Sequence, residues 1–516
     1  MEIIAMSEYL AQEVLHVIII PGLIIMSIYL YLTSTFDFWL KLNVPFKKPT
    51  VLLGNFGDLL LFRKSQPEGI KEMYNWFPES RYFGVFRVRS PILILRDPEL
   101  IKTINVKDFS CFMNRGIPVN SQDSLSEHLF NMEGKKWKGM RSKLTPVFSS
   151  GKIKRMFYLL VECHEELKKV IGTSRGVVDV RDLTAKFTID VIGSCAFGIQ
   201  IRALTDGQSA FHEAAKKLGK PSYKSTLWRM LRTSMPRLYK LLGVQVINPE
   251  VIAFFKDVVS QMVRQREEEG GRRHDFMDLL VELKNKGSLV MDPGNAADGD
   301  EDIVLDENAI AAQAFVFFVA GHETSSNTIA FCLYELALNP RIQEKVREEI
   351  LKETEGCAGK LTYDAVQEMK YLDKVILETL RKYPPAPLLS RRCEYPYKIP
   401  ETDVELPAGM RVVIPIYGIH HDPRHYPSPE EFDPERFNEE NKSKRSPYTY
   451  LPFGEGPRNC IGMRFALLET KVGIISFLQH HRVEINDKTA VPIKFSRRSL
   501  VTTSETGFWL TLSSLE

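Results

Sequence analysis

Apolar positions recur along most of this chain with the spacing of an α-helix. In stretches such as 156–171 (MFYLLVECHEELKKVI) and 342–354 (IQEKVREEILKET), apolar residues return at i, i+3 and i+4, on one helix face. Apolar runs typical of strands are few and short, and the best examples are 81–88, 91–96, 411–418 and 508–515. The pattern therefore predicts a mainly α-helical fold with small β-sheets.

One apolar run near the amino terminus has the length of a membrane span. Val14–Leu32 contains nineteen residues without a formal charge, and about twenty apolar residues cross a bilayer core as a helix. A cleaved signal peptide is the alternative, but it would show a basic start, a shorter apolar stretch and small residues at the cut site. The acids Glu2, Glu8 and Glu13 precede the run, and Lys41, Lys47 and Lys48 follow it. The positive-inside rule then places the rest of the chain in the cytosol.

The segment after the span predicts a short connection to one large body. Phe36, Phe38 and Trp39 suit a membrane interface, and Pro45 and Pro49 would stiffen a linker. We expect a membrane anchor at 1–33, a proline-containing linker at 34–50 and a single catalytic domain at 51–516. Within that domain, the polar, Gly-rich and acidic stretch 284–302 is expected to be a surface loop.

The longest predicted helix begins near Asp306 and ends at Pro340, and would be about 50 Å long. Its apolar middle, 314–331, could be taken for a second membrane span. A polar cluster at 321–324 interrupts that apolar run, however, and charge inside a membrane is costly. A buried helix with a polar break fits the sequence better.

Composition narrows the class of protein. Of 516 residues, 44% are hydrophobic and 26% are charged, which is ordinary for a globular protein. A net charge of +3 is too weak for a general nucleic-acid binder. The seven cysteines are odd in number and form no CxxC pair, which argues against a disulfide framework and against a zinc site. The body is therefore expected in a reducing compartment.

The stretch Pro452–Ala466, PFGEGPRNCIGMRFA, is the most informative in the chain. It resembles the haem-binding signature F-x-x-G-x-R-x-C-x-G of the cytochrome P450 family at every defined position: Phe453, Gly456, Arg458, Cys460 and Gly462. The resemblance implies haem b (iron protoporphyrin IX) with Cys460 as the thiolate ligand of iron. Gly456 and Gly462 would allow close approach or positive φ, and helix N–H groups after the loop would stabilise the thiolate.

Further motifs extend the resemblance from Pro45 to the end of the chain. In WKGMR, Trp137 and Arg141 match W-x-x-x-R, which implies contact with a haem propionate. Arg458, Arg391 and Arg115 are the other arginines for which the resemblance implies that role, since the guanidinium fork suits carboxylates. The alternative for WKGMR is a solvated basic helix, because four lysines surround it: Lys135, Lys136, Lys138 and Lys143. Both interpretations hold if Arg141 turns inward.

AGHETS, 320–325, matches the family's [A/G]-G-x-[D/E]-T-[T/S] in the long helix. The resemblance implies that Gly321 makes room over the porphyrin, that Thr324 offers a hydroxyl for oxygen activation and that Glu323 joins the proton path. The alternative is a threonine bonded back to its own helix. His322 departs from the family's usual residue, and we expect it to pack away from iron.

A charged cluster is predicted to support the cysteine loop. Glu378 and Arg381 match E-x-x-R and lie on one helix face. On its own this pair is common on protein surfaces. Arg436, in PERF, would complete the cluster, as the resemblance implies.

The resemblance implies a monooxygenase, an oxidoreductase that inserts one atom of O2 into an organic substrate. The sequence contains neither a GxGxxG fingerprint nor a flavin domain, so electrons from NADPH would come from a separate NADPH-cytochrome P450 reductase, with cytochrome b5 as a further partner. The lysines of 135–143 could steer such an acidic partner. No nucleic-acid partner is expected.

The sequence is most similar to insect microsomal members of the family, which implies the endoplasmic reticulum membrane and lipophilic xenobiotics, such as plant toxins or insecticides, as substrates. An endogenous lipid or hormone stays open, because the expected substrate-facing loops (115–129, 203–242, 388–389 and 502–506) carry no readable code. A haem-thiolate isomerase or dehydratase and a haem sensor are the other classes. Residues 214–248 have eight bases and no acid, which fits either a solvated face or a second contact with the membrane.

Overall fold

The computed structural model describes residue 9 and residues 15–120, 122–174, 176–206, 209–219, 223–269, 275–286, 305–356 and 359–515. Some predictions fall outside these residues: those for Glu2, Glu8, Glu13 and Cys357, and the prediction for the loop 284–302 beyond its first three residues.

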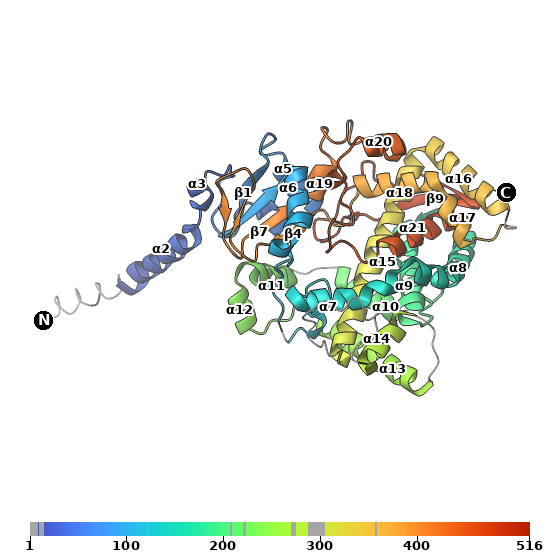
Figure 1. The fold of residues 1–516 in the computed structure, drawn as a ribbon, viewed down its shortest axis with the longest axis horizontal. Helices are drawn as coiled ribbons and strands as arrows, with labels where there is room; N and C mark the ends of the chain where they lie inside the picture. Colours follow the sequence, from blue (N-terminus) through green and yellow to red (C-terminus); the bar gives the residue numbers. More distant parts are fainter. Residues whose placement is uncertain are drawn as a thin grey trace.

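Helices make up most of the described chain, as predicted (Figure 1). The longer ones are α2 (Ile20–Thr33), α7 (Gly134–Leu144), α8 (Ser150–Thr173), α9 (Val180–Ile192), α10 (Ala210–Gly219), α11 (Tyr223–Ser234), α13 (Pro249–Glu269), α14 (Phe276–Lys286), α15 (Glu307–Leu338), α16 (Pro340–Glu355), α18 (Lys370–Lys382) and α21 (Met463–Leu478). The shorter ones are α3 (Phe38–Lys41), α4 (Gly57–Leu60), α5 (Gln66–Tyr74), α6 (Pro98–Lys102), α12 (Pro236–Leu241), α17 (Tyr363–Glu368), α19 (Ile416–His420) and α20 (Glu439–Ser443). Short 3-10 or π-helical segments, some of them continuous with an α-helix, are η1 (Leu15–Ile19), η2 (Thr103–Lys107), η3 (Phe109–Phe112), η4 (Ser124–Ser126), η5 (Thr145–Phe148), η6 (Gly193–Phe197), η7 (Pro434–Phe437) and η8 (Pro447–Thr449).

The strands form three small sheets. A four-stranded sheet has the order β1-β2-β7-β4, a three-stranded sheet β3-β9-β8, and β5 pairs with β6. Their bounds are β1 (Tyr82–Arg87), β2 (Ser90–Leu95), β3 (Gly176–Asp179), β4 (Leu389–Arg392), β5 (Tyr397–Lys398), β6 (Glu405–Leu406), β7 (Arg411–Ile414), β8 (His481–Glu484) and β9 (Trp509–Ser514). All four predicted strands are present. The one predicted at 411–418 is too long, because Pro415 offers no N–H to the ladder and Ile416–His420 forms α19 instead.

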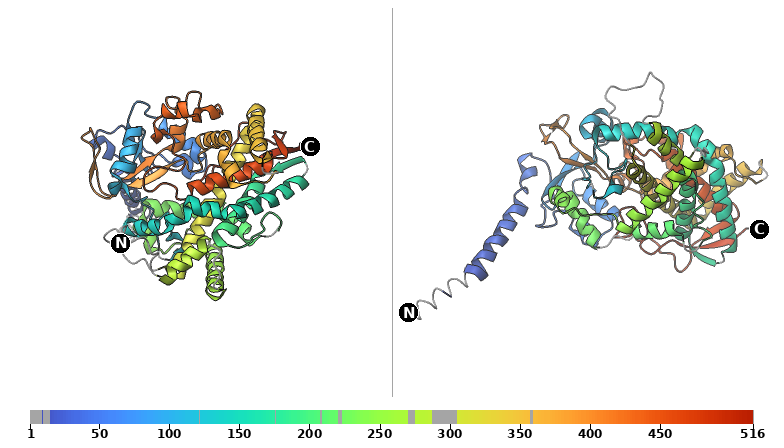
Figure 2. Two further views of the ribbon diagram at one scale, coloured as in Figure 1. Left: turned by 45° about the vertical axis from the view of Figure 1, so that its right-hand side comes forward. Right: turned by 90° about the horizontal axis from the view of Figure 1, so that it is seen from below.

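The long helix α15 crosses the helical part of the molecule (Figures 1 and 2). It begins where predicted, because the Asp306 carboxylate caps it by accepting from the backbone N–H of Ala309 at 2.7 Å. Its 32 residues span about 48 Å. α9 packs along it, and Thr184 and Thr188 of α9 donate side-chain hydrogen bonds to carbonyls of α15. α15 is thus the buried helix with a polar break that the sequence predicts.

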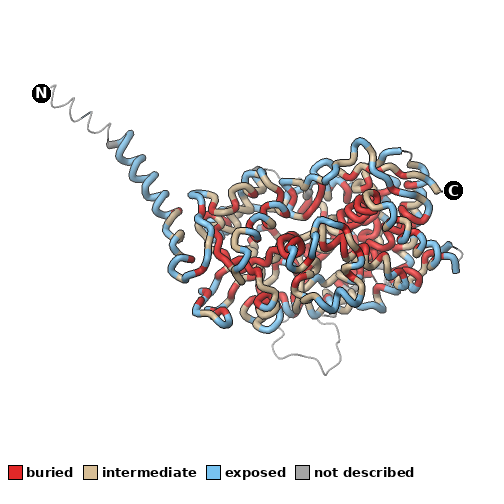
Figure 3. Tube along the Cα trace, turned by 90° about the horizontal axis from the view of Figure 1, so that it is seen from above, coloured by how far each residue is buried: buried red, intermediate tan, exposed pale blue. Residues whose placement is uncertain are grey.

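The four-stranded sheet is buried on both faces. Alternate residues of β2 enter different apolar clusters, with Leu93 and Leu95 on one side and Ile92 and Ile94 on the other. A third and larger cluster surrounds α15. Figure 3 shows buried residues along the middle of the body, whereas the amino-terminal helix is exposed.

The amino-terminal helix projects away from the body (Figures 1 and 2). Residues 16–33 have a mean hydropathy of 2.0, and only 6% of this window is buried. The length and composition of this helix would allow it to cross a membrane.

The prediction that Trp39 lies at a membrane interface is wrong. Its side chain is fully buried beneath β1, where Nε1 donates to the carbonyl of Val85 at 3.2 Å. Gly84 makes this possible, since a Cβ there would lie 2.4 Å from the indole ring. The backbone N–H of Gly84 also donates to the Pro45 carbonyl at 2.7 Å. The segment 34–50 is therefore partly packed against the four-stranded sheet, and does more than connect the amino-terminal helix to the body.

Candidate active site around Cys460

The cysteine loop lies between η8 and α21 and closes on itself. The backbone N–H of Cys460 donates to the Phe453 carbonyl at 2.8 Å, and that of Asn459 donates to Gly456 at 3.1 Å. Gly456 has a φ of +80°, and a Cβ at this position would lie 2.0 Å from the Asn105 carbonyl oxygen, so the position requires glycine.

The expectation for the second signature glycine is wrong. Gly462 has a φ of −92°, and a Cβ there would come no closer than 3.6 Å to Phe148. Gly454, which the signature leaves undefined, has a φ of +70°. Sequence reasoning missed this position, and a third glycine in the same loop was the available signal.

Cys460 is accessible although it is set deep in the molecule. Of the six described cysteines, all free, only Cys460 is exposed. Burial raises the pKa of its thiol, whereas the backbone N–H of Gly462 and the charges of Arg141 and Arg115 lower it. Gly462 caps the amino end of α21, so the sulfur faces the positive end of a helix. These contacts offset part of the effect of burial, but the net shift of the pKa is upward, so a thiolate here needs a further positive partner such as a metal ion.

The middle of α15 is also open, which indicates an interior space near the loop. Ala320 is exposed although α15 is otherwise largely buried. Phe148 links the two parts: its ring lies 5.4 Å from that of Phe317, one turn before Ala320, and it is the nearest side chain to Gly462. The loop and the exposed part of α15 therefore lie on either side of Phe148.

Arg141 and Arg458 hold the loop. Arg141, on α7, donates to the carbonyl and the side-chain oxygen of Asn459, both at 2.9 Å. Arg458 donates to the carbonyl of Met113 at 2.6 Å and lies 4.7 Å from the centre of the Trp137 ring. Trp137 is buried and thus packs beneath a loop arginine, as a cation–π partner.

The other two predicted arginines complete a cluster. Arg115 donates to the Phe130 carbonyl at 2.9 Å and to the Arg458 carbonyl at 3.4 Å. Arg391, on β4, is buried, and the one hydrogen bond of its guanidinium within the described residues goes to the carbonyl of its neighbour Ser390 at 3.1 Å.

This cluster has no acidic partner. Among the described residues, none of the four arginines forms an ion pair with a carboxylate, and the Nε atoms of Arg391 and Arg458 are buried without a hydrogen-bond partner. Burial lowers the pKa of Arg391 to about 10, and burial together with the charge of Arg391 lowers that of Arg458 to about 9. An arginine stays protonated in a protein, so these shifts indicate a site that is stabilised by bound anions. Two carboxylates such as haem propionates fit it.

Gly321 has a packing role that the sequence did not reveal. A Cβ on this residue would lie 2.5 Å from the Ile192 side chain of α9, so glycine lets the two helices approach here, and its predicted place over the porphyrin stays a prediction. Ala320 is the residue of this motif whose small side chain meets open space. The sequence signal was the pair of small residues Ala320 and Gly321, and a sequence pattern alone does not determine which of the two faces the open space.

Thr324 and Glu323 lie on the same turn. The Thr324 hydroxyl donates to the Ala320 carbonyl at 2.6 Å, the back-bonded geometry that the alternative interpretation gives. Its oxygen can still accept a hydrogen bond from water. Burial raises the pKa of Glu323, and the charge of Arg181 opposes the shift. Burial therefore favours the protonated form of this carboxyl more than water does.

His322 packs away from the loop, as expected. It is buried, it stacks on Phe318 with ring centres 4.9 Å apart, and its Nδ1 lies 3.1 Å from the Phe318 carbonyl. Burial lowers the pKa of His322 to about 4, so it is neutral.

The predicted charged cluster is present. Arg381 donates to both oxygens of Glu378 at 2.7 and 2.9 Å, and Nε of Arg436 lies 3.4 Å from Glu378 Oε1. Arg381 also donates to the carbonyls of His420 and Pro429. The cluster therefore links α18 to the segment before the cysteine loop.

Sequence reasoning missed a second acid near this region. Glu469, on α21, is fully buried, neither oxygen has a hydrogen-bond partner among the described residues, and burial raises its pKa to about 8. Its place in an apolar helix was the available signal.

Comparisons with known proteins identify the family of this chain. The sequence profile of the family described as Cytochrome P450 matches residues 46–511. "Probable cytochrome P450 6a13" of Drosophila melanogaster is 40% identical over 490 residues, 95% of this chain and 97% of the relative. "Cytochrome P450 9e2" of Blattella germanica is 38% identical, with 95% and 96% covered, and "Cytochrome P450 6B6" of Helicoverpa armigera is 40% identical, with 91% and 92% covered. This chain therefore belongs to the cytochrome P450 family, with insect relatives, and is a monooxygenase, an oxidoreductase.

Proposed function

We propose that this protein is a membrane-anchored, NADPH-dependent haem-thiolate monooxygenase of lipophilic small molecules, with xenobiotics as its substrate class. The observation that carries the proposal is the buried arginine cluster beside Cys460, which has no carboxylate partner among the described residues. Membership of the family implies haem. Cys460 would ligate its iron, and Arg115, Arg141, Arg391 and Arg458 would receive its propionates, with Trp137 and Phe453 supporting the loop.

Bound haem supplies the capacity to activate O2, and a thiolate ligand favours cleavage of the O–O bond. This chain's own residues control proton supply. The Glu323 carboxyl, whose pKa burial raises, lies one residue before Thr324, and the Oγ1 atom of Thr324 can accept a hydrogen bond from water. Ala320 keeps side-chain bulk away from the open space.

The electron donor is a separate protein. α7 supports this proposal, because Lys135, Lys136 and Lys138 are exposed while Trp137 on the same helix is buried. An acidic patch on NADPH-cytochrome P450 reductase, or on cytochrome b5, would meet this basic face.

We place the anchor at residues 1–33 in the endoplasmic reticulum membrane, with the catalytic domain at 51–516 in the cytosol. A second contact is supported by α11 and α12, which lie at the same end of the body as the anchor (Figure 1). Leu238, Leu241 and Leu242 are exposed there, beside the exposed bases Arg237 and Lys240. Apolar residues flanked by bases suit a membrane surface.

The test begins with a reduced CO difference spectrum of the full chain, in which a red-shifted Soret band marks a thiolate ligand. NADPH consumption and product are then measured with purified reductase and a panel of lipophilic xenobiotics. Turnover that requires both O2 and reductase is expected. Conversion of a peroxide substrate without reductase would instead identify an isomerase or dehydratase, and haem binding without any turnover would identify a sensor.

A further inference from the structure

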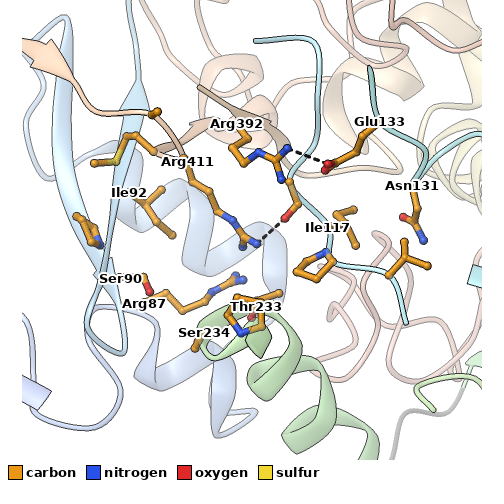
Figure 4. Close-up of a pocket in the computed structure, with 18 of the residues that line it drawn as sticks. Arg87, Ser90, Ile92, Ile117, Asn131, Glu133, Thr233, Ser234, Arg392 and Arg411 are labelled. Carbon is orange, nitrogen blue, oxygen red and sulfur yellow. Dashed lines mark hydrogen bonds and ion pairs between the residues drawn. The ribbon is translucent and has the colours of Figure 1, made fainter. Parts of the chain in front are cut away.

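A cavity of about 780 Å³ (Figure 4) lies near the segment that follows the amino-terminal helix, since Phe38 is part of its lining. The edge of the four-stranded sheet, residues 116–119 and the ends of α11 and α12 enclose it. Its lining includes no residue of α15 or of the cysteine loop, but it borders the site around Cys460 at Met132, whose carbonyl accepts a hydrogen bond from Arg458.

The lining of this cavity is basic and its charges are only partly neutralised. It contains five bases, Arg87, Lys136, Lys240, Arg392 and Arg411, and two acids, Glu127 and Glu133. Arg392 pairs with Glu133 at 2.8 Å, and Glu127 is exposed. Arg87 and Arg411 form no ion pair with a carboxylate of the described residues.

Three polar atoms in the lining are buried without a hydrogen bond among the described residues: Nε of Arg87, the hydroxyl of Ser234 and Oε1 of Glu133. The other carboxylate oxygen of Glu133 is held by Arg392, which offsets its charge. The Arg87 guanidinium lies 4.7 Å from the centre of the Phe56 ring, and the Arg411 guanidinium donates to the Gly116 carbonyl at 2.7 Å. Figure 4 shows the guanidinium groups of Arg87 and Arg411 extending into the same region.

Both arginines lie in unfavourable surroundings, Arg87 beside the charge of Arg411, and Arg411 beside the charges of Arg392 and Arg232. Burial lowers the pKa of Arg87 to about 10, and the charge of Arg411 contributes to the shift. A buried charge without a partner is costly, and a planar guanidinium binds phosphate or carboxylate through two parallel hydrogen bonds. An anion that bridges both arginines would remove this unfavourable interaction.

The position of the cavity identifies the source of that anion. Arg89, in the turn between β1 and β2, stacks 4.0 Å from the centre of the Tyr31 ring and donates to the Ser34 hydroxyl at 3.0 Å. The eighteen residues 16–33 would span about 27 Å, close to the thickness of a bilayer core. Ser34 then lies at headgroup level, and Phe38, four residues later, lines the cavity.

We propose that this cavity binds the phosphate of an acidic phospholipid headgroup, held by Arg87 and Arg411 with the hydroxyl of Ser234. The inference rests on the proposed membrane anchor for its ligand source, and it does not depend on the proposed chemistry. Zwitterionic lipids would bind less well, because their cationic headgroup would enter a basic cavity.

The test is a titration of the detergent-solubilised full chain with soluble short-chain lipids, followed by the thermal midpoint of unfolding. Dihexanoyl-phosphatidic acid should stabilise the protein at concentrations at which dihexanoyl-phosphatidylcholine does not. In Arg87→Gln and Arg411→Gln, the apparent affinity should fall at least about tenfold. Lys224→Gln is the matched control, since Lys224 is exposed on α11 and outside the lining.

An unchanged response in Arg87→Gln would overturn the site, and equal stabilisation by inorganic phosphate would overturn the assignment to lipid. If Arg87→Gln does not fold, Arg87→Lys keeps the charge but loses the planar fork and should show weakened binding, whereas wild-type affinity in that variant would also overturn the proposal. The CO difference spectrum is recorded in parallel. If that signal is absent but lipid binding is intact, the haem-thiolate chemistry is refuted and the lipid site is not.

Discussion

Cys460 differs from the other described cysteines in its surroundings. It is the exposed one, it receives the N–H of Gly462, and two arginines lower its pKa. Cys460→Ser should abolish the red-shifted band of the reduced CO complex, because serine cannot supply a thiolate. Cys111→Ser is the control, since Cys111 is also not fully buried but lacks this setting. If the band survives in Cys460→Ser, another residue ligates the iron.

The hydroxyl of Thr324 can take part in two hydrogen bonds, one as donor and one as acceptor. Its hydrogen is donated to Ala320, but its oxygen can still anchor water beside the open space. Thr324→Ala should keep haem yet uncouple the reaction, so that peroxide increases severalfold and product decreases for each NADPH consumed. Thr328→Ala is the matched control, because Thr328 makes the same backbone bond at 2.8 Å one turn later and is buried. Equal coupling in Thr324→Ala and the wild type would show that protons arrive by another route.

At the scale of elements, the link between α18 and the segment before the cysteine loop depends on one buried ion pair. Glu378 and Arg381 are both fully buried, and removing one member leaves a buried charge without its partner. Glu378→Gln should lower the free energy of unfolding by about 3–5 kcal/mol and cause loss of haem on warming. Glu213→Gln breaks an exposed pair of the same i, i+3 spacing, Glu213 with Lys216, and should change stability little. Chemical denaturation of both variants, monitored by the Soret band, provides the comparison.

The contact between α15 and α21 includes a carboxyl that is neutral at physiological pH. Because burial raises the pKa of Glu469 to about 8, the unfolded chain releases this proton above about 4.5 while the folded chain retains it. The free energy of unfolding therefore falls as pH rises from about 4.5 toward 8, by at most about 1.4 kcal/mol per pH unit. Glu469→Gln should remove this decline, so its advantage over the wild type should grow between pH 5.5 and 7.5. Glu213→Gln serves as the exposed control, and parallel pH profiles for wild type and Glu469→Gln would contradict the assignment.

The elements that sequence could predict are those whose signal is local. The helix α15 follows from a capping aspartate and an apolar run that ends before Pro340, and the strand β2 from an apolar run of five residues. The roles of Gly321 and Trp39 could not be predicted in this way. Each depends on a residue far along the chain, Ile192 for Gly321 and Gly84 for Trp39. The signature identifies Cys460, but only the fold shows that, among the described residues, its arginines form no ion pair with a carboxylate and that Arg391 and Arg458 keep buried Nε atoms without a partner.

At the scale of the whole molecule, the boundary between anchor and body lies between α2 and Trp39. The helix α2 is mostly exposed, whereas Trp39 is fully buried and donates to Val85. Two truncations therefore have different outcomes. Deletion of residues 1–33 should leave a folded body that binds haem. Deletion of residues 1–41 also removes Trp39, and the loss of a buried tryptophan should lower the free energy of unfolding by about 3–5 kcal/mol, so that much less folded, haem-binding protein is recovered.

The shorter truncation also tests how the body meets the membrane. Without α2, the remaining attachment would come from α12 and the residues that follow it, where Leu238, Leu241 and Leu242 are exposed. Changing these three leucines to serine in the 1–33 deletion should release the protein into the soluble fraction, because each leucine contributes apolar area that the bilayer would otherwise bury. Flotation with vesicles measures the attachment, and the CO difference spectrum confirms an intact body. A truncated protein that stays bound after the three changes would place the second contact elsewhere on the surface.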